Sequence, residues 1–378
     1  MKAALTVLLT GAGAPGTRGA LYALRHNPDG VQIRAVGTDI RADGVGRLWM
    51  DAFHQVPPPE DAGYLAALLE ICRREAVELV IPQTTRELFA FARHKAVFEA
   101  EGVRVMVADL PAIEVANNKA ALLQVVEQMG LPCPTYHLTR SKTELADAAA
   151  ALGYPGKPVV VKPPVSNGMR GFRVLREGAW DLARFLAEKP NGVEISLDEL
   201  LAVLGRGAAW PELLVTEYLP GAEYSVDAFL GADLSVAVPR LRRVIRSGIS
   251  FENELEYRDD LIQATLALGR QVGLKYAFGF QFKLDQNGVP KILECNPRLQ
   301  GTMVASLFGG VNVIWLGVRE ALGEGPSGAT TGPGPGPTAA DPTGAAAAPA
   351  PGGAPFRPAT FLRFWGGIGL SGDQIDEI

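Results

Sequence analysis

Strand-like apolar runs alternate with amphipathic, helix-like segments through the first third of the chain, and this alternation limits the fold more than any other feature. It is typical of right-handed β-α-β units around a parallel sheet. The expected strands are Ala4–Thr10, Gln32–Thr38, Val77–Pro82 and Val103–Ala108, with helical segments such as Gly63–Glu75 and Glu87–Glu99 between them. Residues 1–112 are therefore predicted to form one doubly wound α/β domain.

The pattern changes after Asn118. A helix-like segment, Lys119–Gly130, ends at a glycine and is followed by prolines that disfavour further helix. Val159–Lys162 and Phe172–Leu175 flank a polar glycine loop, which predicts antiparallel strands joined by a mobile hairpin. Later strands are expected at Leu213–Tyr218, Glu223–Leu230, Leu234–Ile245, Ala277–Asp285 and Pro290–Cys295. This second half is predicted to be α+β.

Residues Gly323–Pro358 are mainly Gly, Pro, Ala, Ser and Thr. The segment has too few large apolar side chains to offset the entropy lost on ordering it. We therefore expect a disordered linker. The apolar run Ala359–Trp365 follows and is predicted to dock as one last strand, with residues 359–378 forming a strand and a tail.

Composition excludes several classes of protein. The chain has 378 residues, of which 47% are hydrophobic. Its net charge is −5, and it has no block of five basic residues that could bind nucleic acid. Its three cysteines, Cys72, Cys133 and Cys295, lack the spacing of a zinc site or a disulfide framework. The apolar start runs into glycines before reaching membrane length. We expect a cytoplasmic protein with no nucleic-acid or membrane partner, and a homodimer is left open.

The first motif is Gly11-x-Gly13-x-x-Gly16, between a predicted strand and a helix, with Asp39 at the end of the next strand. This spacing matches a dinucleotide fingerprint, in which glycines admit a pyrophosphate and the acid binds a ribose. The same glycines could instead serve only tight packing of strand and helix. The residues alone leave both interpretations open.

The second motif is Lys162 at the end of an apolar strand, followed by the loop Ser166-Asn167-Gly168-Met169-Arg170-Gly171. A compact cation beside several backbone N–H groups suits nucleotide phosphates. The alternative is a lysine that reaches solvent beside an ordinary hairpin.

The third motif runs from Thr216 to Asp227 and contains Glu217-Tyr218-Leu219-Pro220-Gly221. An extended segment closed by Pro-Gly can present backbone groups to a purine, and Glu223 just beyond it can accept ribose hydroxyls. A plain β-hairpin would give the same pattern.

The fourth motif is the most informative. Strand alternation places Glu294 and Asn296 on one face, and the Asn287-Gly288 turn brings Gln281 or Asp285 of the partner strand near them. Oxygen ligands with room for water and phosphate are what Mg²⁺ requires. A solvated polar strand face is the alternative.

An arginine run, Arg240, Arg242, Arg243 and Arg246, alternates along another predicted strand. Some of its guanidiniums should face the cleft and at least two should face water. We take Arg240 as the catalytic candidate from this run. Lys119 opens a helix, where the helix dipole slightly disfavours a cation unless an anion lies nearby.

In their order and spacing, these segments resemble the ATP-grasp superfamily and, within it, proteins like the carbamoyl phosphate synthase large subunit. The resemblance covers residues 1 to about 322. It implies a pre-ATP-grasp, Rossmann-like domain at 1–112 and two ATP-grasp subdomains at 113–190 and 191–322, with the linker at 323–358. It also implies ATP and Mg²⁺ or Mn²⁺ as cofactors.

Site residues follow from the resemblance position by position. It implies phosphate binding by Lys119, Lys162 and a flap containing Ser166, Gly168 and Gly171, and nucleoside binding by Glu217, Tyr218, Leu219 and Glu223. It also implies metal binding by Gln281, Glu294 and Asn296, with Arg298 steadying the transferred phosphoryl group. Under this interpretation Gly11, Gly13 and Gly16 shape the first domain and need not bind a dinucleotide.

The function that these motifs favour is an ADP-forming carboxylate-amine ligase, in which a carboxylate or carbamate is activated as an acyl phosphate. The chain has one grasp module where the synthase large subunit has two, so a complete synthase is not expected. The alternatives are a nicotinamide-dependent oxidoreductase that uses Gly11-x-Gly13-x-x-Gly16, and a non-catalytic nucleotide-binding protein. Substrate contacts are expected at Thr84, Thr85, Arg86 and Glu87, just past a strand end.

Overall fold

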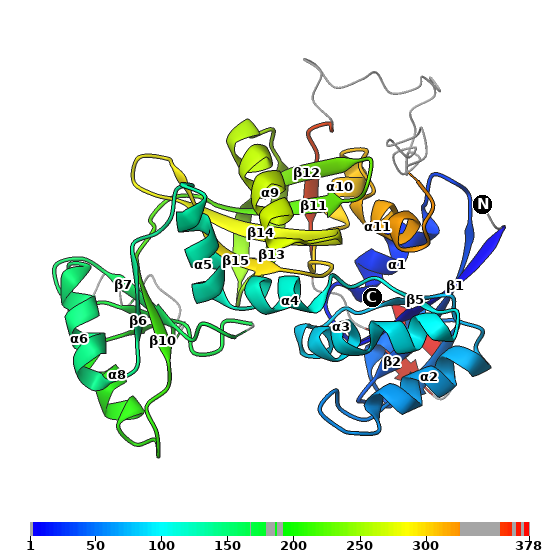
Figure 1. Cartoon of the computed structure of the whole chain (residues 1–378), viewed down its shortest axis with the longest axis horizontal. Coiled ribbons are helices and arrows are strands. Elements are labelled where there is room, and N and C mark those ends of the chain that lie inside the picture. Colours follow the sequence, from blue (N-terminus) through cyan, green and yellow to red (C-terminus); the bar gives the residue numbers. More distant parts are fainter. Residues whose placement is uncertain are drawn as a thin grey trace.

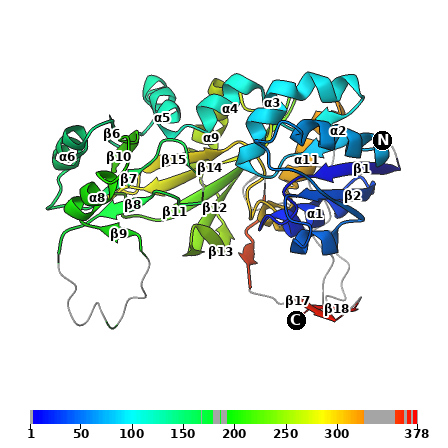
Figure 2. The same ribbon diagram turned by 90° about the horizontal axis from the view of Figure 1, so that it is seen from below.

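The computed structural model describes residues 3–166, 168–178, 186, 192–325, 356–364, 368–371 and 374–377. Within these residues the strands form three larger sheets and one two-stranded hairpin, β17 (Ile368–Ser371) with β18 (Gln374–Glu377). The first and middle sheets lie at opposite ends of the molecule, and the third lies between them (Figure 1; Figure 2). No helix in the described parts of the chain has the length and apolarity needed to cross a bilayer.

The first sheet is parallel throughout and has the strand order β3-β2-β1-β4-β5. Its strands are β1 (Ala4–Leu9), β2 (Gln32–Asp39), β3 (Ala52–Gln55), β4 (Leu79–Ile81) and β5 (Arg104–Val105). The helices between them are α1 (Thr17–Arg25), α2 (Tyr64–Arg74) and α3 (Thr85–Ala100), with a 3₁₀ turn at Val45–Trp49. Val7, Leu8 and Leu9 of the central strand are fully buried because helices cover both faces. The doubly wound prediction is confirmed.

The middle sheet has the order β6-β10-β7-β8-β9. Its strands are β6 (Tyr136–Thr139), β7 (Val159–Lys162), β8 (Arg173–Leu175), β9 (Glu194–Ile195) and β10 (Leu213–Glu217), and α6 (Lys142–Ala151) and α8 (Leu197–Leu204) pack against it. β7 and β8 are antiparallel, as expected. The sheet continues to residue 217, so the expected boundary at 190 falls inside it. Leu213 and Val215 of β10 belong to this sheet's own small core, whereas Leu214 belongs to the large core.

The third sheet has the order β15-β14-β11-β12-β13-β16 and is antiparallel. Its strands are β11 (Glu223–Leu230), β12 (Ser235–Arg246), β13 (Ile249–Leu255), β14 (Tyr276–Leu284), β15 (Pro290–Asn296) and β16 (Thr360–Leu362). The remaining helices are α4 (Leu110–Ala116), α5 (Lys119–Gln128), α9 (Asp259–Val272), α10 (Ala305–Phe308) and α11 (Val313–Ala321). The third sheet and the first domain share one hydrophobic core.

The segment after the expected linker returns to the body of the protein. β16 pairs with β13, which confirms a last docked strand, although Trp365 lies outside the described residues. Arg363 donates hydrogen bonds to the carbonyl oxygens of Pro15 (3.3 Å) and Gly301 (2.7 Å). Most of the expected linker, residues 326–355, also lies outside the described residues.

The glycine motif is used for close packing. The backbone N–H of Gly13 donates to the Asp39 carboxylate (2.8 Å), so this carboxylate caps the glycine turn. A Cβ on Gly16 would lie 2.9 Å from the Cα of Gly301, which covers the start of α1. Gly16, at the start of this helix, therefore packs closely against the backbone of Gly301. This geometry favours the packing role of the glycines.

We expect Gly16→Ala to lower the free energy of unfolding by about 1–3 kcal/mol, because the new methyl group meets backbone that cannot rotate away. Gly44→Ala is the matched control: Gly44 has φ −61°, and its Cβ would come no closer than 3.4 Å to a neighbour. Urea unfolding of both variants measures the difference. Equal stability of the two variants would contradict the close packing of α1 against Gly301.

Candidate active site

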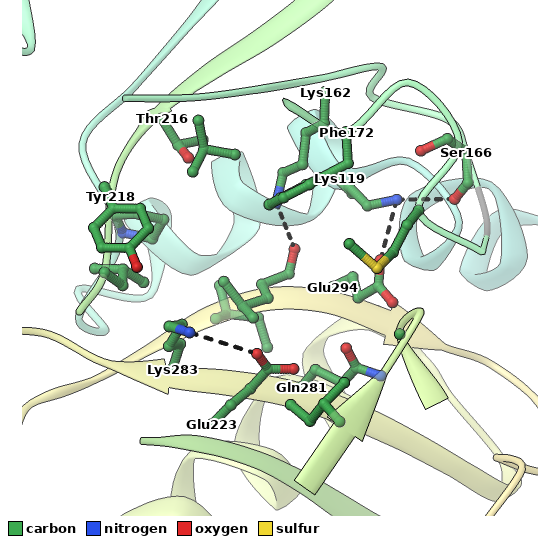
Figure 3. Close-up of a pocket in the computed structure, with 18 of the residues that line it drawn as sticks. Lys119, Lys162, Ser166, Phe172, Thr216, Tyr218, Glu223, Gln281, Lys283 and Glu294 are labelled. Atoms are coloured by element: carbon green, nitrogen blue, oxygen red, sulfur yellow. Dashed lines mark hydrogen bonds and ion pairs between the residues drawn. The ribbon is translucent and has the colours of Figure 1, made fainter. Parts of the chain in front are cut away.

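A first cavity of about 300 Å³ lies between the middle and third sheets (Figure 3). Strands β7 and β10 line one side, and β11, β12, β14 and β15 line the other. Its apolar lining includes Leu123, Val160, Phe172, Leu219 and Ile292, and its charged lining comprises Lys119, Lys162, Glu217, Glu223, Arg242, Lys283 and Glu294. A slot with apolar walls and several cations suits a flat ring attached to an anion.

Two lysines lie beside Glu294 on the middle-sheet side of this cavity. Lys119, whose helix is capped by the Asn118 side chain, contacts the Glu294 carboxylate (3.2 Å) and donates to the carbonyl oxygen of Ser166 (2.9 Å). Lys162 donates to the carbonyl oxygen of Leu293 (3.4 Å). Burial lowers the pKa of Lys162 to about 8, and Glu294 partly offsets this effect. An added anion would therefore meet cations that have little solvent around them.

The pairing of β14 with β15 brings the metal candidates together. Gln281 lies directly opposite Glu294, and the next pair is Phe282 with Ile292, so Leu293 is an extra, bulged residue. This bulge lets both Leu293 and Glu294 line the first cavity. Gln281, not Asp285, is the neighbour of Glu294: Asp285 lies at the hairpin turn, where it accepts from the backbone N–H groups of Asn287 and Val289.

The donor set fits a magnesium ion that is held largely by phosphate. Mg²⁺ in proteins usually takes one or two carboxylates and completes its shell with water and substrate phosphates. The oxygens of Glu294, Gln281 and Asn296 each already face a cationic side chain, Lys119, Arg242 and Arg298 respectively. Among the described residues no three His, Cys, Asp or Glu side chains gather as a metal cage. The site therefore fits a nucleotide-bound metal.

The segment between β10 and β11, which we call the hinge, lines the first cavity. Tyr218 and Leu219 line it, as expected. The Glu217 carboxylate accepts from the Thr135 backbone (2.8 Å) and from Lys291 (2.7 Å), so it fixes the hinge. Glu223 lines the cavity and forms ion pairs with Arg242 and Lys283.

A second cavity of about 470 Å³ adjoins the first, and Arg242, Gln281 and Glu294 line both. Its other walls come from the loop after β15 and from the first domain. Thr84, Thr85 and Arg86, which the sequence analysis names as expected substrate contacts, line this cavity, and their contact with a substrate stays a prediction. Arg298 also lines it, and its Nε donates to the Thr85 hydroxyl (3.2 Å).

Two family models match the chain. Residues 7–106 match "PylC-like, N-terminal domain", and residues 209–336 match "ATP-grasp in the biosynthetic pathway with Ter operon". The second match covers the hinge, the arginine strand and the β14–β15 pair. Residues 209–336 thus match an ATP-grasp family, and the chain resembles the large chain of carbamoyl phosphate synthase.

Curated relatives agree with this assignment. The chain is 31% identical over 229 residues to an uncharacterised protein, y4rH, of Sinorhizobium fredii, covering 57% of this chain and 44% of that protein. It is 27% identical over 236 residues to the carbamoyl phosphate synthase large chain of Thermomicrobium roseum, covering 59% of this chain and 20% of that one. The chain thus spans less than half the length of these relatives.

Solved ATP-grasp structures share the fold. Biotin carboxylase from Campylobacter jejuni superposes with a TM-score of 0.64 at 17% identity, covering 86% of this chain and 73% of that one. The ADP complex of an N5-carboxyaminoimidazole ribonucleotide synthetase gives 0.63 at 17% identity, covering 86% and 79%. ATP-grasp enzymes use ATP and Mg²⁺, and one solved neighbour, the biotin carboxylase domain of the Hydrogenobacter thermophilus 2-oxoglutarate carboxylase, holds MgADP.

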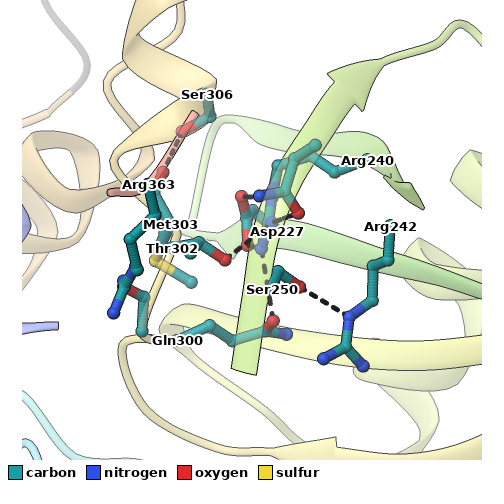
Figure 4. Close-up of polar contacts among 11 residues, drawn as sticks. Asp227, Arg240, Arg242, Ser250, Gln300, Thr302, Met303, Ser306 and Arg363 are labelled. Carbon is teal, nitrogen blue, oxygen red and sulfur yellow. Dashed lines mark hydrogen bonds and ion pairs between the residues drawn. The ribbon is translucent and has the colours of Figure 1, made fainter. Parts of the chain in front are cut away.

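One predicted catalytic residue of this ATP-grasp protein lies elsewhere. Arg240 is fully buried and lines neither cavity (Figure 4). It forms two hydrogen bonds with Asp227 (2.6 and 2.8 Å) and donates to Asn253 and Thr302. This placement does not fit a catalytic role, and we propose none. Arg243 and Arg246 of the same strand are exposed, as expected for at least two arginines of this run.

Arg242 is the arginine that reaches the site. It donates to Ser250 (2.6 Å), to Glu223 and to the carbonyl oxygen of Gly248 (2.6 Å). Strand alternation gives Arg240 and Arg242 the same parity, so the sequence did not show which of the two reaches the cavity. The turn Ser247-Gly248 was also missed: both residues have positive φ (49° and 78°), which is typical of a tight hairpin, and both line the cavities.

The predicted flap is only partly a lining element. Ser166 and Gly168 line the first cavity, and Gly168 also lines the second. Gly171 lines neither; its φ is 75° and a Cβ there would lie 2.7 Å from Pro163, so it shapes the loop. Asn167 lies outside the described residues.

Glu87, the fourth expected substrate contact, does not line the second cavity but a smaller one beside Asp39. It is 4% exposed and accepts from the hydroxyls of Thr10 and Thr84, and burial raises its pKa to about 7. A carboxyl group with a raised pKa stabilises the fold fully below its unfolded pKa of ~4.3, and that stability is lost as pH rises through about 7.

We therefore expect the parent protein to lose on the order of 3 kcal/mol relative to Glu87→Gln between pH 4.5 and 8, because the amide does not ionise. Urea unfolding of both proteins at pH 5, 6, 7 and 8 measures this slope. A pH-independent difference between them would show that Glu87 does not titrate in this range.

Proposed function

We propose that this ATP-grasp protein is an ADP-forming ligase that activates a small-molecule carboxylate as an acyl phosphate for capture by an amine or similar nucleophile. The observation that carries the proposal is the junction of the two cavities at Gln281 and Glu294, with lysines on one side and Arg298 on the other. A donor and an acceptor of a phosphoryl group can meet only at such a junction.

The nucleotide belongs in the first cavity. Its apolar slot would hold the base next to Tyr218 and Leu219, and Glu223 would accept ribose hydroxyls once it exchanges one of its two cationic partners. Lys119 and Lys162 would bind the phosphates, because both ammonium groups already flank one carboxylate in a partly dry site. Gln281, Glu294 and Asn296 would hold Mg²⁺, which supplies charge neutralisation at the transferred phosphate.

The carboxylate belongs in the second cavity. There its oxygen would attack the γ-phosphorus in line while the bond to the β-phosphate oxygen breaks, giving ADP and an acyl phosphate. An amine then attacks the acyl carbon, phosphate leaves, and the nitrogen loses a proton. Arg298 is fixed by Thr85, Leu299 and Asn296, so it can stabilise developing charge without reorganisation.

We expect Lys162→Met to weaken ADP binding by about 10- to 100-fold, because a charge-assisted phosphate contact contributes roughly 1.5–3 kcal/mol. Methionine fills the same buried space, so the apoprotein should keep its melting temperature. Asp39→Asn, in the glycine-motif domain, is the control and should leave ADP affinity unchanged. Calorimetry on both variants decides: loss of binding in Asp39→Asn alone would favour an oxidoreductase that uses the first domain.

We expect Glu294→Gln to reduce ADP formation at saturating Mg-ATP by at least ~100-fold, because the amide neither neutralises nor holds the metal as well. Glu294 is 30% exposed and pairs with Lys119, so the loss in unfolding free energy should be small, ~0–1 kcal/mol. Turnover and melting temperature measured together test this. Turnover within a few-fold of the parent would remove Glu294 from the metal site.

A further inference from the structure

The second cavity is too large for the smallest acids. At about 470 Å³ it exceeds the nucleotide cavity and falls in the range of sites for drug-sized molecules. Bicarbonate or carbamate, with four non-hydrogen atoms each, would leave most of it empty. The acceptor acid therefore carries further groups that the cavity walls must recognise.

The charge of these walls is strongly one-sided. Among the residues that the structure describes, four arginines line the cavity, Arg86, Arg170, Arg242 and Arg298, against one carboxylate, Glu294. That carboxylate is the proposed metal ligand, so it does not balance the arginines toward the substrate. A walled, arginine-rich cavity concentrates anions.

Two of these arginines have defined duties. Arg242 is held by Glu223, Ser250 and Gly248, so it is part of the wall. Arg298 uses three of its five N–H groups, on Thr85, Leu299 and Asn296. The two that are left suit one carboxylate, the reacting one, beside the metal residues.

Arg86 differs because its present partner is easily exchanged. It is the second residue of α3, directly after the threonine that holds Arg298. Its guanidinium pairs with Glu60 (2.5 and 2.8 Å), but the two side chains are 54% and 60% exposed. Such surface pairs contribute about 0–1 kcal/mol, so a substrate anion inside the cavity can replace Glu60.

We propose that the acceptor substrate is a carboxylic acid that carries a second anionic group, and that Arg86 is the residue that selects it. Arg298 takes the reacting carboxylate, and Arg86 takes the second anion, which a planar guanidinium binds through two parallel hydrogen bonds. Of these two roles, only that of Arg298 rests on the proposed ligase function.

The test uses pairs of acids that differ only in the second anion: aspartate and asparagine, glutamate and glutamine, O-phosphoserine and serine. ADP release with Mg-ATP and thermal protection in the presence of Mg-ADP are measured for each. We expect the dianionic member of at least one pair to be preferred in both. Arg86→Gln should lower kcat/KM for that member by about 10- to 100-fold, with ADP affinity unchanged.

Two further variants sharpen the result. Arg93→Gln removes the same charge from an exposed position on the same helix and should change nothing. Glu60→Gln removes the competitor of Arg86 and should lower KM for the dianionic acid while leaving its neutral partner unaffected. Equal use of both members of every pair, or equal effects of Arg86→Gln and Arg93→Gln, would overturn the proposal.

The ligase function itself fails by a different signature. Failure of the parent protein to bind Mg-ADP, or ADP release by Glu294→Gln at the rate of the parent, would count against the nucleotide and metal site. Absence of any preference in thermal protection, with Mg-ADP binding intact, counts against the second anion only.

Discussion

The pairing of β14 with β15, and the extra residue in it, is the constraint on which the site depends. With Gln281 fixed opposite Glu294 and Leu293 bulged, one strand directs a carboxylate and a backbone carbonyl to the same cavity. The carboxylate meets Lys119 of α5, and the carbonyl meets Lys162 of β7. Without the bulge, strict alternation would turn either Leu293 or Glu294 away. The contacts that Leu293 and Glu294 make with these two lysines follow from that one irregularity.

The charges around this pair are balanced without a ligand. Every candidate metal oxygen faces a cationic side chain, and Glu223 faces two. Unpaired carboxylates close together would repel one another. Asp285, the other candidate neighbour of Glu294, lies at the turn instead. Binding of metal and phosphate would therefore exchange ion pairs rather than create charge in a dry site, which keeps the desolvation cost low.

Much of the fold was predictable, because it rests on local patterns. The strands Val159–Lys162 and Glu223–Leu230 have the predicted bounds, and the parallel sheet follows from its alternation with helices. The boundary at 190 was wrong because β10 pairs with strands far earlier in the chain, which periodicity cannot reveal. The same limit applies to side chains: Arg240 and Arg242 have the same parity, but a buried Asp227 holds one and the cavity receives the other.

The reacting end of the site belongs to no single domain. Arg298 follows β15 of the third sheet, yet Thr85 at the start of α3 in the first domain accepts from its Nε. The two domains are held in register by one continuous core and by Asn312 of the α11 cap, which donates to Ala23 of α1 (2.8 Å). Arg363 adds a clamp between Pro15 and Gly301 on the same side. Because these contacts set where Arg298 points, the geometry at the proposed phosphoryl-transfer site depends on domain docking. A well-packed interface is stiff, so this docking can hold the guanidinium to the tolerance that electrostatic catalysis needs.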